Sequence, residues 1–202
     1  MTDHSAKTEC RYRAVVVGVS AGGLDALGTL LPSLPQTFPL PVLIVQHLLA
    51  GSGDYLAQSL DEKCALHVKE ADEKEPIQPG RVYIAPANYH LLVERDETLS
   101  LSVNGSVHYS RPSIDVLFES AARVWGAAVI GVILTGASAD GAEGMRMIAR
   151  RGGLAVVQDP ATAEQAVMPR AAIEAAGEKH VLPLAQIGPF LVRAACGTGE
   201  RT

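Results

Sequence analysis

Three side chains suited to acyl-transfer chemistry follow apolar runs of the kind that form buried strands. Ser20 and His47 each come directly after such a run, and Asp140 lies in a glycine-rich loop after residues 127–134. A serine hydroxyl becomes an effective nucleophile when a neutral imidazole accepts its proton. The imidazole in turn needs a carboxylate that fixes its tautomer and stabilises its charged form. The three residues therefore supply a nucleophile, a base and an orienting acid.

The stretch around Ser20 has the pattern of a strand, a tight turn and a helix. Residues 18–22 read Gly-Val-Ser-Ala-Gly and fit G-x-S-x-G, in which small neighbours allow a sharp turn that lifts the hydroxyl above the sheet. Backbone N–H groups just past such a turn point at the group that the hydroxyl attacks. Two other roles fit the same residues: Ser20 as the N-cap of the following helix, or the glycine turn as a phosphate site.

The order of the three residues along the chain bears on the fold. Carboxyl ends of parallel strands form the edge at which α/β sheets bind ligands. The order Ser20, His47, Asp140 differs from the Ser, Asp, His order of α/β-hydrolases, so a triad here requires a different fold. Asp159 also ends an apolar run and is an alternative orienting acid. His90 has two interpretations, a residue near the site or a partly buried structural histidine.

Composition restricts the class of protein. A chain of 202 residues is long enough for one α/β domain with a sizeable core. Its 48% hydrophobic and 19% charged residues are typical of a globular protein, and no apolar run approaches the roughly 20 residues that span a bilayer. The first ten residues lack the apolar core of a signal peptide, so we expect a cytoplasmic protein that is not itself a membrane protein.

The cysteines and the net charge exclude further classes. Three widely spaced cysteines without a C-x-x-C pair predict neither a disulfide framework nor a zinc site. A net charge of −5 without a Lys/Arg cluster argues against a nucleic-acid partner.

We expect one domain over residues 14–196, with disordered tails at residues 1–13 and 197–202. Strands are predicted at residues 15–19, 41–47, 64–70, 127–134, 152–157 and 181–184. Helices are predicted at residues 24–31, 53–63, 113–125, 168–176 and 187–196, with another after the Asp140 loop. Three short strands within residues 81–103 are predicted to form antiparallel hairpins. Ser113 is predicted to cap the helix that follows it, a segment that we assign to the scaffold.

Six motifs occur in the order found in the catalytic domain of the CheB-type chemoreceptor protein-glutamate methylesterases, and the chain resembles that family from about Ala14 to its last helix. They are Gly18-Val19-Ser20-Ala21-Gly22-Gly23, Gln46-His47, Tyr83-Ile84-Ala85-Pro86, Arg111-Pro112-Ser113-Ile114-Asp115, Leu134-Thr135-Gly136 with Asp140-Gly141-Ala142-Glu143-Gly144-Met145, and Met168-Pro169-Arg170.

The resemblance implies a three-layer, doubly wound α/β fold of Rossmann-like type, with a mostly parallel sheet and an antiparallel hairpin. It also implies hydrolysis of glutamyl γ-methyl esters on the cytoplasmic helices of methyl-accepting receptors, with release of methanol. Deamidation of certain receptor glutamines is a second activity of the family, and no metal or cofactor is implied. Ser20, His47 and Asp140 fall where the family has its nucleophile, base and orienting acid.

The chain departs from the family's usual pattern at two places. Ala21 stands where a Thr is usual, and Ala137 where a Met is usual. We expect the backbone N–H groups of Ala21 and Ala137 to form the oxyanion site, because an alanine can supply a backbone N–H as well as the usual residue can. The usual protein also has a receiver domain before the catalytic domain. The 13 residues before the first strand cannot hold one, so we expect no control by phosphorylation within this chain.

Two alternative functions stay open on the sequence. The two alanines also fit a catalytically silent receptor-binding module of the same fold. A dinucleotide-binding domain needs G-x-G-x-x-G and an acid at the end of the second strand. Here Ser20 takes the place of the middle glycine and His47 ends that strand.

Overall fold

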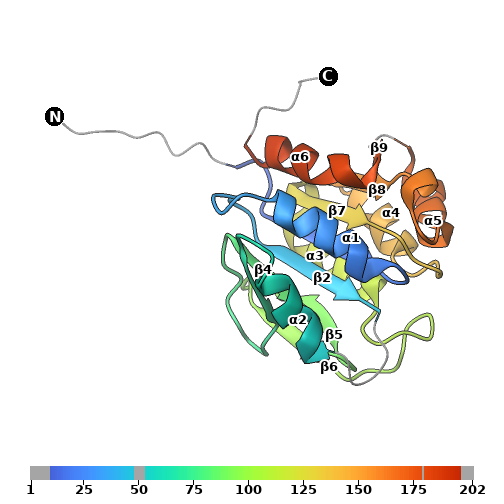
Figure 1. Ribbon diagram of the computed structural model, residues 1–202. Helices are drawn as coiled ribbons and strands as arrows, with labels where there is room; N and C mark the ends of the chain where they lie inside the picture. The colour runs from blue at the N-terminus through green and yellow to red at the C-terminus, as the bar shows by residue number, and fades with distance from the viewer. Residues whose placement is uncertain (1–9, 48–52, 179, 197–202) are drawn as a thin grey trace.

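The computed structural model describes residues 10–47, 53–178 and 180–196, which form a three-layer α/β domain (Figure 1). Its central sheet has seven strands in the order β3-β4-β2-β1-β7-β8-β9, and each printed pairing between neighbours is parallel. The strands are β1 (Ala14–Val19), β2 (Val42–Gln46), β3 (His67–Glu70), β4 (Arg81–Ile84), β7 (Val129–Ile133), β8 (Leu154–Gln158) and β9 (Val181–Leu182). The predicted fold class is confirmed.

Helices cover both faces of the sheet, which is why its central strands are apolar without alternation. Side chains of β1 point alternately to the two faces: Val15 and Val17 pack in one core, and Val16 packs in the other. The first core is closed by α1 (Gly23–Leu30), α2 (Gly53–Asp61) and α6 (Leu184–Ala195). The second is closed by α3 (Ile114–Trp125), α4 (Ala142–Arg150) and α5 (Val167–Ala176). The short 3-10 turns are η1 (Leu31–Ser33), η2 (Gly126–Ala128) and η3 (Pro160–Thr162).

A separate antiparallel pair, β5 (His90–Val93) and β6 (Leu99–Ser102), packs on α3. The prediction of hairpins throughout residues 81–103 is therefore correct for β5 and β6 and wrong for β4. β4 lies inside the parallel sheet between β3 and β2. Residues 82–84 are buried, and a strand buried on both faces is stabilised by central parallel pairing rather than by a hairpin.

The predicted tails lie mostly outside the described residues, which begin at Cys10 and end at Cys196. Of the range predicted as the first tail, the structure describes residues 10–13, and two of these contact the domain. Tyr12 is buried in the first core, and the Arg13 N–H donates to the Ala128 carbonyl at 2.7 Å. No helix within the described ranges is long and apolar enough to cross a membrane.

Candidate active site

Ser20, His47 and the Asp140 loop follow the carboxyl ends of three adjacent strands, β1, β2 and β7. Val19, before Ser20, is in register with Gln46, before His47. Because β1 lies between the other two strands, the three segments meet at one edge of the sheet, as the sequence predicts.

The structure brings His47 and Asp140 into direct contact. His47 Nε2 lies 2.8 Å from Asp140 Oδ2, and the Asp140 side chain is fully buried. A carboxylate accepts hydrogen bonds only, so the Nε2 proton is on the imidazole. The ring nitrogen left to accept a proton from a nucleophile is Nδ1.

The start of α3 binds the same carboxylate with three further donors. The Ser113 hydroxyl donates to Oδ1 at 2.8 Å, and the N–H groups of Ile114 and Asp115 donate to Oδ2 and Oδ1 at 2.7 and 3.1 Å. Burial by itself raises the pKa of the Asp140 carboxyl. The hydrogen bonds from His47 and from α3 outweigh burial, so this pKa lies below its ordinary value and the group is ionised at neutral pH.

Two glycines, Gly18 and Gly141, allow the start of α3 to lie close to β1 and to the Asp140 loop. A Cβ at Gly18 would lie 2.3 Å from Ile114 Cγ2, and one at Gly141 would lie 2.6 Å from the same atom. The first residue of α3 is thus packed between the strand that leads to Ser20 and the loop that carries Asp140. This contact sets the distance between the helix N-terminus and the carboxylate.

The prediction of the N-cap at Ser113 is correct for its position and wrong for its side chain. Ser113 is the N-cap residue, but its side chain makes no capping hydrogen bond. Asp140, from a distant loop, accepts the first N–H groups of the helix in its place. The segment is also more than scaffold, because it positions the carboxylate that contacts His47.

The Ser20 turn is held from both sides. Gly22 adopts a left-handed backbone, with φ of 76°, and α1 begins at the next residue. Gln46 Nε2 donates to the Ser20 carbonyl at 2.9 Å, and Thr135 Oγ1 donates to the Ala21 carbonyl at 2.9 Å. Side chains at the ends of both neighbouring strands therefore fix this turn.

The Ser20 hydroxyl makes no hydrogen bond to another residue in the part of the chain that the structure describes. Nucleophile-to-base contacts are commonly loose without substrate and tighten in the reacting complex. In the same described part, neither the Ala21 N–H nor the Ala137 N–H donates to an acceptor. Both donors are thus open, as an oxyanion site requires. The assignment of Ser20, His47, Asp140, Ala21 and Ala137 to the site stays a prediction.

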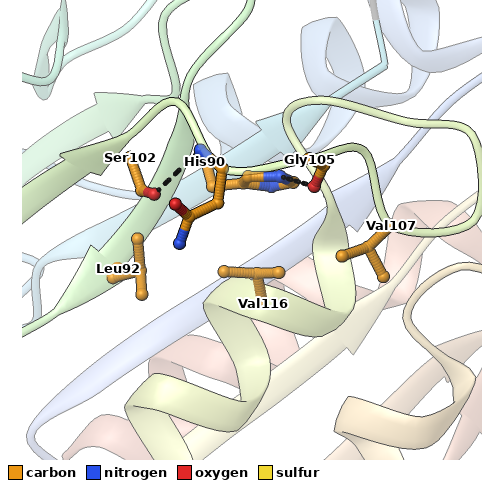
Figure 2. A pocket seen from close by; sticks show the side chains of 7 residues that line it. His90, Leu92, Ser102, Gly105, Val107 and Val116 are labelled. Atoms are coloured by element: carbon orange, nitrogen blue, oxygen red, sulfur yellow. Dashed lines mark hydrogen bonds between the residues drawn. The ribbon is translucent and has the colours of Figure 1, made fainter.

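The two alternative candidates have structural partners. Asp159 Oδ1 accepts from the Ala161 N–H at 2.9 Å and caps η3. His90 is 1% exposed; its Nδ1 accepts from the Ser113 N–H, and its Nε2 donates to the Gly105 carbonyl, both at 3.1 Å. His90 lines a pocket of about 150 Å³. Figure 2 shows it there with Val116 of α3. His90 therefore supports the start of α3 through Ser113.

Sequence reasoning gave no chemical role to three residues that contact the site: Gln46, Ser113 and Thr135. All three lie within the quoted motifs. Gln46 and Thr135 share one detectable signal, because each is a buried polar residue at or just after the end of an apolar strand.

Within the described ranges, no group of three or more His, Cys, Asp or Glu side chains is arranged to hold a metal ion.

The fold is a three-layer α/β domain, and its candidate site lies at the carboxyl edge of the sheet. The profile of the CheB methylesterase family matches residues 15–191, so the chain belongs to this family. The predicted family and enzyme class are confirmed.

Individual relatives agree with the family. A Leptospira interrogans protein described as "Putative protein-glutamate methylesterase/protein-glutamine glutaminase" is 54% identical over 182 residues, which cover 90% of this chain and 94% of the relative. A protein-glutamate methylesterase/protein-glutamine glutaminase of Symbiobacterium thermophilum is 41% identical, and the match spans half of its length. The crystal structure of the Thermotoga maritima CheB methylesterase catalytic domain superposes with a TM-score of 0.86 at 34% identity, covering 90% of this chain and 98% of that one.

Proposed function

We propose that this protein hydrolyses glutamyl γ-methyl esters on the cytoplasmic helices of methyl-accepting chemoreceptors, and that it deamidates receptor glutamines at the same site. The names of its relatives support both activities. The observation that carries the proposal is the 2.8 Å contact between His47 Nε2 and the buried Asp140 carboxylate, at the sheet edge where Ser20 emerges.

In the first half-reaction, Ser20 Oγ attacks the ester carbonyl while His47 Nδ1 takes the hydroxyl proton. Asp140 holds the Nε2–H and stabilises the imidazolium that forms. The N–H groups of Ala21 and Ala137 donate to the oxyanion of the tetrahedral intermediate. Collapse breaks the bond to methoxide, which leaves as methanol with the proton from His47, and the glutamyl group stays on Ser20 as an ester.

In the second half-reaction, water attacks the acyl-enzyme while His47 accepts a proton from it. Collapse returns that proton to Ser20 Oγ and releases the receptor glutamate. Deamidation follows the same path with a glutamine side chain, and ammonia leaves in place of methanol. Every proton passes through His47, so the rate depends on how Asp140 orients that ring.

Methanol release from methylated receptor membranes tests the proposal. Ser20→Ala should lower the rate by at least about 1000-fold, because the acyl-enzyme cannot form. Ser33→Ala is a matched control, since Ser33 lies in η1 at the other end of α1 and contacts the Leu30 carbonyl rather than the site. Receptor binding without methanol release would contradict the proposal and favour the silent binding module.

A further inference from the structure

Gln46 connects Ser20 and His47, the two residues between which the proposed mechanism transfers a proton. It ends β2 directly before His47 and is 5% exposed. Its Nε2 donates to the Ser20 carbonyl and to the His47 carbonyl, each at 2.9 Å. One amide nitrogen thus bridges the main chain of the nucleophile and the main chain of the base.

These two bonds are additional to the pairing of the strands. The β1–β2 register is formed by the backbone, and the His47 N–H extends it by donating to the Val19 carbonyl at 3.1 Å. Without Gln46 the sheet would keep its ladder. The Ser20 carbonyl would keep only its bond from the Gly23 N–H, and the two carbonyls would lose their common donor.

The oxygen of the same amide is buried, and it accepts no hydrogen bond from any residue that the structure describes. Buried acceptors without a partner are rare and costly, and they occur where another requirement fixes the group. Here Nε2 donates to both carbonyls, and it is the one donor to the His47 carbonyl among the described residues, so the amide directs Nε2 to them and leaves Oε1 facing Gly23 at the start of α1.

Gly23 makes room for this orientation. A Cβ at Gly23 would lie 1.9 Å from Gln46 Oε1. The backbone of Gly23 has no positive φ, so the glycine is needed for space rather than for conformation. Any larger residue there must displace the amide.

We propose that Gln46 is a positioning residue, whose amide sets the distance between Ser20 and His47 and holds the hydroxyl within reach of His47 Nδ1. It acts through the two backbones and does not touch the substrate. The inference rests on the proposed function, because it assumes that Ser20 and His47 react.

Two variants remove the bridge in different ways. Gln46→Met keeps the length of the side chain and deletes both donors, and Gly23→Ala displaces the amide while Gln46 is retained. Each should lower kcat by about 10- to 100-fold, because misplacement of reacting groups by about 1 Å costs about that much. KM should stay within about twofold of the original value. In the Gln46→Met background, Gly23→Ala should cause no further loss.

A fluorophosphonate probe separates positioning from folding. Ser20 Oγ attacks phosphorus, fluoride leaves and the proton passes to His47, so the inactivation rate reports on this pair without the receptor substrate. Both variants should be labelled to full stoichiometry, at rates lowered by the same factor as kcat. A smaller titratable fraction with unchanged kcat per labelled site would mean a merely structural role and would overturn the inference.

Gln36→Met is the matched control. Gln36 is exposed in the loop before β2, at the opposite end of that strand from His47, and its variant should react at the original rate. If the original protein is not labelled, or if Ser20→Ala is still labelled, both the proposed function and this inference are contradicted. If labelling depends on Ser20 and Gln46→Met reacts as fast as the original protein, only the positioning role fails.

Discussion

The Asp140 carboxylate is a buried charge whose hydrogen-bonding capacity is used by four donors of the described residues. Three of them belong to the start of α3, where the helix dipole also favours negative charge. These donors stabilise the buried anion. The remaining hydrogen bond of the carboxylate is the one that it accepts from His47.

Asp140→Asn tests this role. The amide can no longer accept from Nε2–H and from all three α3 donors together, so His47 loses its correct tautomer. We expect kcat for methanol release to fall by about 10³- to 10⁴-fold, with an unchanged circular dichroism spectrum. Asp159→Asn is the matched control, because Asp159 also follows a strand but caps η3. Comparable losses in both variants would contradict the assignment.

The pKa of the Asp115 carboxyl is shifted in the opposite direction from that of Asp140. Burial raises the pKa of its carboxyl from 3.8 to about 6, the hydrogen bond from the Gly144 N–H opposes that rise, and the Asp140 charge adds to it. The folded protein therefore binds this proton more tightly than the unfolded chain. The contribution to stability is lost as pH rises from about 4 to about 6, and the full cost is present above that window.

Asp115→Asn should remove this cost, because an amide oxygen can still accept from the Gly144 N–H without carrying charge. We expect the free energy of unfolding to rise by roughly 1 to 3 kcal/mol at about pH 8, and to change little at about pH 3, below the ordinary value of 3.8, where Asp115 is mostly protonated in both states. Urea unfolding at both pH values measures it. A gain of equal size at both would exclude titration of Asp115 as the cause.

The candidate triad could be predicted from sequence because each member follows its own apolar run, and parallel strands bring their carboxyl ends together. The roles of Gln46 and Ser113 could not be predicted in this way. The role of Gln46 depends on which carbonyls face its amide after β1 and β2 pair. The role of Ser113 depends on how α3 packs between Gly18 and Gly141. Both are properties of the packed molecule rather than of a local pattern.

At the scale of elements, β4 shows where pattern alone is insufficient. Short strands with brief polar links favour hairpins locally. Burial of residues 82–84 in both cores instead places β4 beside β2, while β5 and β6 leave the main sheet and pack on α3. Pairing partners in this region are decided by which faces are buried, which requires knowledge of the helices around them.

The turn from β1 into α1 presents Ser20. We expect substitution of Gly22 in this turn and of Gly28 in α1 to have opposite effects on stability. Gly22→Ala should destabilise the protein by about 1 to 2 kcal/mol, since φ is 76° and a Cβ would lie 2.7 Å from Glu164 Oε2. It should also lower kcat by displacing the turn. Gly28→Ala, in the interior of α1 with open space around it, should stabilise by roughly 0.5 to 1 kcal/mol and leave kcat unchanged.

Thermal melting and methanol release on the two variants measure these effects. The comparison is matched because both changes add one methyl group to the same turn-and-helix unit. Loss of stability in both variants, or gain in both, would show that backbone conformation at Gly22 is not what the turn requires.

At the scale of the whole molecule, one sheet is shared by two cores, but only one of them supports the Asp140 carboxylate. Leu117 of α3 and Leu191 of α6 are both almost fully buried, on opposite faces of the sheet. Leu117 belongs to the helix whose first residues donate to Asp140. Leu191 belongs to the helix that packs against α1 on the other face.

Leu117→Ala and Leu191→Ala should therefore separate stability from activity. Each removes similar buried volume and should lower the free energy of unfolding by about 2 to 5 kcal/mol. Only Leu117→Ala should also lower kcat per folded molecule, because a shift of α3 moves three donors of the carboxylate that orients His47. Urea unfolding and methanol release, normalised to the folded fraction, measure the two quantities. An equal loss of normalised kcat in both variants would mean that the site responds to global stability rather than to the position of α3.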